Sequence, residues 1–143
     1  MKKQLILIRG VPGSGKTTMA KQLQKWFMDC SKTAVHFEAD MYFTDTFGEY
    51  RFDHSYLGQA HSWCQNSTRN ALGENDAVIV SNTFVTKKEL RVYFEMAKSV
   101  GIIPTIIVCS GQYKNIHGVP DDIVERKRLS FEHDLTELFE MFK

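Results

Sequence analysis

The chain has 143 residues, 43% of them hydrophobic, and a mean hydropathy of −0.30. This size and composition predict one globular domain over residues 1–143. Its 18 basic and 17 acidic residues nearly cancel. The balance argues against a basic surface spread over the whole protein, of the kind that binds duplex nucleic acid, and leaves room for a local basic patch.

The three cysteines, Cys30, Cys64 and Cys109, lie far apart and form no C-x-x-C pair. An odd number at such spacing predicts reduced, mostly buried thiols in a cytoplasmic protein, and not a disulfide framework or a zinc site. The apolar run near the start is short and ends at Arg9, so it predicts a strand and not a signal peptide. No apolar run approaches the length of a membrane span.

The first half of the chain predicts strands alternating with helices. Residues 4–9 are a nearly continuous apolar run, typical of a central parallel strand buried on both faces. A glycine-rich loop follows, and a helix is predicted from it to about residue 28 by apolar residues at four-residue spacing: Met19, Leu23 and Phe27. A second strand is predicted over 34–38. The connection over 40–54 is rich in aromatic residues and is expected to bind a ligand or fold onto the domain.

The second half continues the alternation, with helices predicted over 55–72 and 87–99 and strands over 77–80 and 103–109. A long last helix is predicted over 120–142. Its apolar stripe consists of Val124, Phe131, Leu135, Leu138 and Phe142. Together these elements predict an α/β fold, a doubly wound parallel sheet of about four strands with helices on both faces.

The loop after the first strand matches G-x-x-x-x-G-K-[ST] at every fixed position. Such a loop between a strand and a helix is the phosphate-binding motif of P-loop enzymes. Its glycines let successive N–H groups face phosphate oxygens, and the helix N-terminus adds its positive dipole end. Lys16 is expected to contact the β- and γ-phosphates and Thr17 to contact Mg²⁺. The predicted nucleotide-binding residues are Gly10, Pro12, Gly13, Ser14, Gly15, Lys16, Thr17 and Thr18.

In a parallel sheet, ligands bind at the carboxyl ends of the strands. Asp40 follows the second strand and could accept a proton from an acceptor hydroxyl, or it could form an Asx turn or a helix cap. The third strand ends in Ser81 and Asn82, where many P-loop enzymes carry a magnesium-binding acid. Asn82 can orient a metal-bound water or a substrate hydroxyl, but it brings no charge.

Phosphoryl transfer usually needs a cation near the transferred group. The candidates are Lys114 after the fourth strand and Arg126, Lys127 and Arg128 on the last helix. For each of them a structural salt bridge is the alternative. Arg128 coincides with the apolar stripe and is therefore expected to point inward.

Five motifs occur in order along nearly the whole chain after the phosphate loop. They are D-M-Y-F at 40–43, G-E-Y-R-F-D at 48–53, A-H-S-W-C at 60–64, S-N-T-F at 81–84 and N-I-H-G-V-P at 115–120. With the loop, this series resembles the kinase domain of phage polynucleotide kinase. It is more similar to the small P-loop ATPase/kinase domains of the ubiquitin-ligase-binding type.

The resemblance implies magnesium-dependent transfer of the ATP γ-phosphate to a 5′-hydroxyl of DNA or RNA. It gives the role of general base to Asp40 and the binding of ATP·Mg²⁺ to Lys16 and Thr17. Trp63 is expected to pack and His61 to hydrogen-bond at the cleft. The aromatic candidates for stacking a terminal base are Tyr42, Phe43 and Tyr50, and the expected substrate-binding residues are Tyr42, Phe43, Arg51, His61 and Asn82.

This chain departs from the family pattern in three places. Phe43 replaces an arginine three residues after the base, Ser81 and Asn82 replace the strand-three acid, and the lid segment before residue 115 is short. Transition-state charge is then left to Lys114, Arg126 or Arg51. A polynucleotide 5′-hydroxyl kinase is the leading hypothesis. The alternatives are a small-molecule kinase of the same fold and a nucleotide-binding or slow ATPase module acting on a protein partner.

Overall fold

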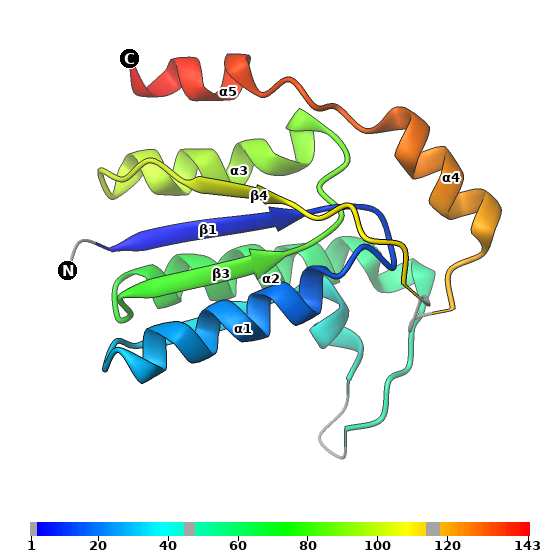
Figure 1. Cartoon of the computed structure of the whole chain (residues 1–143), viewed down its shortest axis with the longest axis horizontal. Helices are drawn as coiled ribbons and strands as arrows, with labels where there is room; N and C mark the ends of the chain where they lie inside the picture. Colours follow the sequence, from blue (N-terminus) through cyan, green and yellow to red (C-terminus); the bar gives the residue numbers. More distant parts are fainter. Residues whose placement is uncertain (1–2, 45–47, 114–117) are drawn as a thin grey trace.

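The computed structural model describes residues 3–44, 48–113 and 118–143. Four parallel strands form one sheet in the order β2-β3-β1-β4. Figure 1 shows β3, β1 and β4 side by side in that order. The strands are β1 (Gln4–Arg9), β2 (Ala34–Phe37), β3 (Ala77–Ser81) and β4 (Thr105–Val108). This architecture confirms the predicted doubly wound α/β sheet, with β1 in an interior position.

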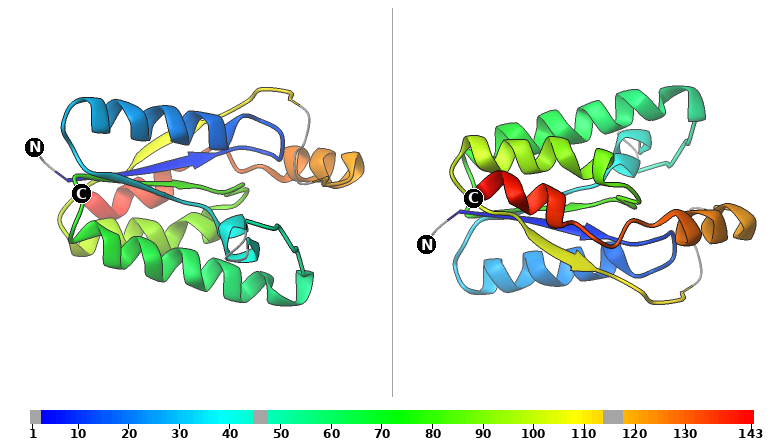
Figure 2. Two further views of the ribbon diagram at one scale, coloured as in Figure 1. Left: turned by 90° about the horizontal axis from the view of Figure 1, so that it is seen from below. Right: turned by 90° about the horizontal axis from the view of Figure 1, so that it is seen from above.

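Helices cover both faces of the sheet (Figure 2). They are α1 (Lys16–Asp29), α2 (Leu57–Leu72), α3 (Lys87–Ser99), α4 (Asp121–Ser130) and α5 (Thr136–Phe139), with short 3₁₀ turns η1 (Ala39–Phe43), η2 (His54–Tyr56) and η3 (Glu140–Phe142). Helix α1 lies on one face, and α2, α3 and α5 lie on the other.

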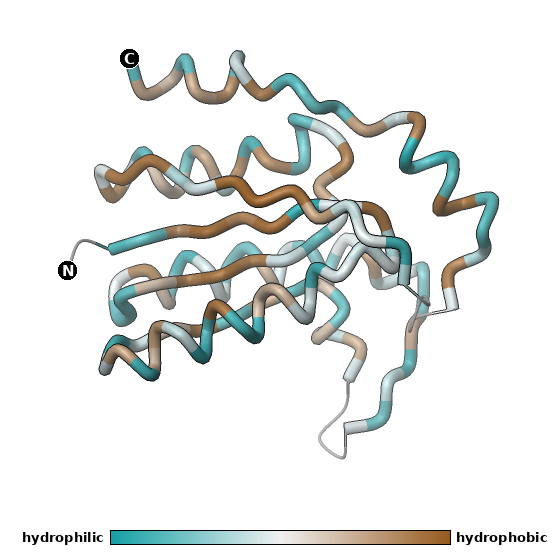
Figure 3. Tube along the Cα trace, in the orientation of Figure 1, coloured by the Kyte–Doolittle hydropathy of each residue, from teal (hydrophilic) through white to brown (hydrophobic). Residues whose placement is uncertain are grey.

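Alternate residues of β1 supply the two halves of the core, because successive side chains of a strand point to opposite faces. Ile6 and Ile8 pack with Ala20 of α1, while Leu5 and Leu7 belong to the larger cluster under α2 and α3. Brown, hydrophobic colour runs along much of β1 and β3 in Figure 3, and also along β4. The predicted continuous apolar run is therefore buried on both faces.

The fourth strand is shorter than the predicted 103–109, because only Thr105–Val108 pairs with β1. Pro104 has no N–H to donate to a ladder, so it limits the strand at its start. As an edge strand β4 is also less buried than its composition predicts, and Val108 is 51% exposed. Cys30 is exposed as well, so the expectation of mostly buried thiols is wrong for that residue.

The single last helix predicted over 120–142 is wrong. Helix α4 ends at Ser130, the backbone of Phe131 is extended, and α5 begins only at Thr136. Asp134 accepts a hydrogen bond from the Thr136 backbone N–H at 3.0 Å, an Asx turn that bends the chain just before α5 begins. Phe131 belongs to the apolar stripe of the predicted helix, but its ring packs against a residue of β1.

That ring lies against the buried guanidinium of Arg9, whose Cζ is 4.0 Å from the ring centroid. Arg9 is 0% exposed and donates to the Phe84 carbonyl oxygen at 2.7 and 3.0 Å and to the Val85 carbonyl oxygen at 3.3 Å. The Glu132 N–H in turn donates to Val85 O at 2.8 Å. Arg9 therefore joins the end of β1, the connection after β3 and the segment after α4.

We expect Arg9→Met to lower the free energy of unfolding by about 2–4 kcal/mol, because it leaves buried carbonyl groups without their charged donor. Urea denaturation measures the change. Arg69→Met is the matched control, since Arg69 is exposed and bonds only to the nearby Asn66 among its described partners; it should change stability by less than about 0.5 kcal/mol. Equal losses in both variants would contradict the anchoring role of Arg9.

Candidate active site

The loop between β1 and α1 has the close internal packing that a phosphate-binding loop needs. A Cβ on Gly10 would overlap Ser14 Oγ and lie 2.5 Å from the Cys109 carbonyl oxygen. Gly15, which precedes α1, has φ 98°, a backbone conformation that L side chains rarely adopt. The loop thus depends on glycine for its shape, and its N–H groups lie at the N-terminus of a helix of 14 residues.

Two polar groups in the loop are suited to a phosphate. Ser14 Oγ is buried and finds no hydrogen-bond partner among the described residues. Lys16 Nζ donates to the Val11 carbonyl oxygen at 3.1 Å. Burial lowers the pKa of Lys16, and the neighbouring carboxylate of Glu38 opposes that shift most strongly. Pro12 and Thr18 lie on the same loop and the first turn of α1.

Glu38 was missed in the sequence, although its carboxylate contacts Thr17, a predicted site residue, and Ser81, which stands where a magnesium-binding acid was expected. Thr17 Oγ1 and Ser81 Oγ each donate to Glu38 Oε2 at 2.9 Å. The signal for it was an acid at the end of β2, two residues before Asp40. Carboxylate and hydroxyl oxygens are the donors that Mg²⁺ prefers, so the residues present fit that cation.

Asp40 lies in η1, directly after β2, and is partly exposed. Tyr50 Oη donates to Asp40 Oδ1 at 3.1 Å. Burial, followed by the negative charge of Asp40, raises the pKa of Tyr50, which keeps the phenol protonated. The Asp40 carboxylate therefore lies within hydrogen-bonding distance of a hydroxyl group, that of Tyr50.

Asn82 lies in the interior and holds η1 in place. Its Oδ1 accepts a hydrogen bond from the Ala39 N–H at 2.8 Å, and its Nδ2 lies 3.7 Å from Cys64 Sγ. These contacts position the turn that carries Asp40. They are different from the predicted contact with a metal-bound water or a substrate hydroxyl.

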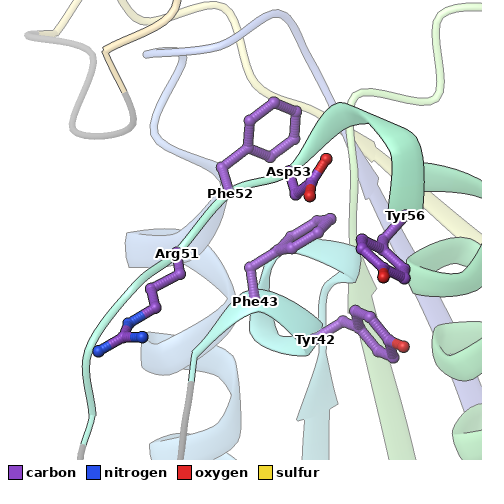
Figure 4. Close-up of a pocket in the computed structure, with 6 residues that line it drawn as sticks. All are labelled: Tyr42, Phe43, Arg51, Phe52, Asp53 and Tyr56. Carbon is purple, nitrogen blue, oxygen red and sulfur yellow. The ribbon is translucent and has the colours of Figure 1, made fainter.

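The aromatic connection folds into a shallow hollow of about 480 Å³ beside η1 (Figure 4). Its lining residues are Tyr42, Phe43, Arg51, Phe52, Asp53 and Tyr56. Phe43 is buried, with its ring centroid 5.0 Å from that of Phe52, whereas Tyr42 is 40% exposed. The Arg51 guanidinium points away from the rings in Figure 4 and pairs with Glu49 at 2.8 Å. His61 is half-buried on α2, and the Trp63 ring packs against Phe37.

The predicted cations divide into three cases. Arg126 and Lys127 of α4 line a second hollow, of about 380 Å³, beside the Thr83–Thr86 connection. Arg128 is exposed and pairs with Glu125, so the expectation that it points inward is wrong. Lys114 lies outside the described residues.

The segment after β4 passes over the phosphate loop. Its Gly111 N–H donates to the Ser14 carbonyl oxygen at 3.1 Å, and the Tyr113 N–H donates to the Gly13 carbonyl oxygen at 2.8 Å. The exposed Tyr113 ring lies close to Gly15 and Gly111. This segment therefore covers the loop on the side of β4. Asp40 follows β2, which forms the opposite edge of the sheet.

A family model described as an AAA domain matches residues 5–116. The chain belongs to this family. Human NEDD4-binding protein 2 is a relative, 36% identical over 95 residues, or 66% of this chain. The chain spans about 5% of that protein's length.

Three solved structures support the assignment of this AAA domain to the P-loop kinase fold. Kti12 of Chaetomium thermophilum in complex with ADP-AlF3 has a TM-score of 0.67 at 14% identity, with 96% of this chain and 95% of that chain covered. The APS kinase CysC of Mycobacterium tuberculosis with AMPPNP and APS has a TM-score of 0.58 at 14% identity, covering 88% and 68%. The Pnkp1/Rnl/Hen1 complex gives 0.59 at 18% identity, covering 95% and 42%.

These comparisons confirm the expected P-loop kinase-like fold and the resemblance to the ubiquitin-ligase-binding type. Two of the neighbouring structures hold nucleotide analogues, AMPPNP and ADP-AlF3. None of the helices in the described ranges is both long and apolar enough to cross a membrane.

We expect Gly10→Ala to weaken binding of an ATP analogue roughly five- to hundredfold, because the new methyl group overpacks the loop at a cost of about 1–3 kcal/mol. Fluorescence titration with a labelled analogue measures the affinity. Gly58→Ala is the control: nothing lies within 4 Å of a Cβ there, and alanine in α2 should stabilise the protein by up to about 1 kcal/mol. Unchanged affinity in Gly10→Ala would contradict the assigned loop function.

Proposed function

We propose that this chain is an ATP-dependent kinase that moves the γ-phosphate of ATP to the 5′-hydroxyl of DNA or RNA. One observation carries the proposal: a hydroxyl group lies 3.1 Å from Asp40, on the Tyr50 side chain. A general base must lie within about 2.6–3.2 Å of the hydroxyl that it deprotonates. The position of the Tyr50 hydroxyl is one that the alcohol of an acceptor could take.

The loop residues hold the nucleotide in this proposal. Backbone N–H groups and the N-terminus of α1 bind the phosphate oxygens, and Lys16 leaves the Val11 carbonyl oxygen to contact the β- and γ-phosphates. Thr17 would hold Mg²⁺, which neutralises charge on the phosphates when it is bound. Asp40 accepts the proton as the acceptor oxygen bonds to phosphorus and ADP leaves.

The aromatic hollow beside η1 supports a nucleic-acid acceptor. Tyr42, at its rim, is exposed and belongs to the same turn as Asp40. Aromatic rings stack on any base and contribute about 1–3 kcal/mol per base, without needing a strongly basic surface. The near-neutral net charge of +1 is compatible with contacts to a strand end. Arg126, Lys127 and Arg51 remain candidate cations for the transferred phosphate within the described residues, and Lys114 remains a candidate outside them.

We expect Asp40→Asn to reduce transfer of label from γ-labelled ATP to a 5′-hydroxyl oligonucleotide by about 10²–10⁴-fold, because the amide cannot accept the proton. Affinity for an ATP analogue should stay within a few-fold of wild type. No transfer by the wild type, or full transfer by Asp40→Asn, would contradict the proposal. Label found on a small molecule from a metabolite panel, with oligonucleotides untouched, would indicate a small-molecule kinase instead. ATP binding with no acceptor-dependent turnover would indicate a nucleotide-binding module that acts on a partner.

We expect Tyr50→Phe to lower the KM for the oligonucleotide about two- to tenfold, since the acceptor no longer competes with a hydrogen bond worth roughly 0.5–1.5 kcal/mol. The phenylalanine ring keeps the surface for stacking. Steady-state kinetics at saturating ATP measure the effect, with Tyr56→Phe as the control at the rim of the same hollow. A raised KM in Tyr50→Phe alone would show that the phenol hydroxyl assists the acceptor instead of competing with it.

A further inference from the structure

We propose that Glu38, at the end of β2, is the carboxylate that positions Mg²⁺ in this chain, in place of the acid that β3 lacks. The inference rests on the ATP-and-magnesium part of the proposed function and is independent of the acceptor. It assigns a role to a residue that the sequence motifs passed over.

The contacts of Glu38 place it at the motif hydroxyl. Thr17 Oγ1 donates to Glu38 Oε2 at 2.9 Å, and the Thr hydroxyl of this loop is the group expected to bind Mg²⁺. The Glu38 side chain is 15% exposed, so its charge is poorly screened by water. A cation bound to the Thr17 hydroxyl oxygen would therefore lie next to a fixed, partly buried negative charge.

The position where a strand-three acid is expected holds Ser81, and Ser81 is bonded to Glu38. The Ser81 hydroxyl donates to Glu38 Oε2 at 2.9 Å. Strands β2 and β3 are parallel neighbours, with Phe37 paired to Val80, so Glu38 and Ser81 occupy corresponding places at adjacent strand ends. The negative charge that is missing at the end of β3 is thus supplied from the end of the neighbouring strand β2.

A buried histidine fixes the orientation of this carboxylate. His36 Nε2 lies 2.6 Å from Ser81 Oγ. Because the Ser81 hydroxyl gives its one proton to the carboxylate, the contact requires His36 to donate from Nε2. The chain of bonds from His36 through Ser81 to Glu38 aims the acid at Thr17. Metal sites commonly hold their ligands in place through such outer contacts.

Glu38 also acts on the second functional group of the loop. Its negative charge is the strongest influence opposing the lowering of the Lys16 pKa by burial. One carboxylate therefore lies close to both the hydroxyl and the ammonium group that the motif provides. If Glu38 only linked β2 to α1, it would not need to lie close to both Thr17 and Lys16. A structural role and a metal-positioning role therefore predict different effects of magnesium on the Glu38 variants.

The test compares the affinity of a fluorescent, non-hydrolysable ATP analogue with Mg²⁺ and with EDTA. Electron paramagnetic resonance of Mn²⁺ in the presence of the same analogue gives a second, direct measure of metal binding. The variants are Glu38→Gln, the charge-restoring double variant Glu38→Gln with Ser81→Asp, and Glu74→Gln. Glu74 is an exposed carboxylate just before β3, at the other end of the sheet, and serves as the control.

In the wild type and in Glu74→Gln, Mg²⁺ should strengthen analogue binding. In Glu38→Gln the ratio of affinities with and without Mg²⁺ should fall by about 10–100-fold, the range by which loss of a residue that positions a metal site lowers metal affinity, and Mn²⁺ binding should weaken equally. Ser81→Asp should restore most of both in the double variant.

Magnesium dependence and Mn²⁺ binding that are unchanged in Glu38→Gln would overturn the inference, as would a wild-type affinity that Mg²⁺ does not alter. If Glu38→Gln fails to fold, Glu38→Asp provides the test, because it keeps the charge but withdraws it from Thr17. A reduced magnesium effect then supports the inference, and a full one overturns it. Absence of phosphate transfer in the wild type would refute the kinase proposal alone, since none of these measurements needs an acceptor.

Discussion

The site depends on the way in which the end of β1 is tied to the segment that follows β3. The Asn82 N–H donates to the Ile8 carbonyl oxygen and the Gly10 N–H to the Thr83 carbonyl oxygen, each at 3.2 Å, while Arg9 holds the next two carbonyl groups. These bonds fix the phosphate loop relative to Asn82. The Asn82 side chain then holds the Ala39 N–H, and with it the turn that carries Asp40. The phosphate loop and Asp40 are therefore positioned through one backbone connection, although β1 and β2, which they follow, are not neighbours in the sheet.

The parts of this arrangement that follow from local pattern could be predicted from the sequence. The run from Leu5 to Ile8 is apolar at every position because β1 is covered on both faces. The order of strands and helices then requires parallel pairing, which brings the loop and Asp40 to the same end of the sheet, where the strands have their carboxyl ends. The family motifs added the expected roles of individual residues. The alternation of strands and helices and the motifs could be predicted because each depends either on residues close together in the sequence or on the general geometry of parallel sheets.

The errors arose where a contact between distant residues decided the outcome. Phe131 has the spacing of a helix stripe, yet its ring packs on the Arg9 guanidinium and its backbone is extended. Tertiary packing there overrides helical periodicity. Glu38 was overlooked for a related reason: in the sequence it continues a strand of alternating character, and only the fold brings Thr17 and Ser81 to its carboxylate. Arg9 gave no signal either, because a charged residue at the end of an apolar run is ordinarily exposed.

Glu38 changes how the departure from the family pattern at β3 should be interpreted. A motif comparison treats Ser81 and Asn82 as the loss of a negative charge, which would favour a protein that binds nucleotide without acting on it. In three dimensions, neighbouring strands of a sheet lie only about 4.7–4.9 Å apart, so the longer acidic side chain of Glu38, just after β2, can reach the space that an acid on β3 would occupy. The cation responds to the charge and position of the oxygen atoms and not to the strand that supplies them. The absence of an acid from β3 is therefore weak evidence against catalysis, and the proposed kinase activity depends on Asp40 and the hydroxyl beside it.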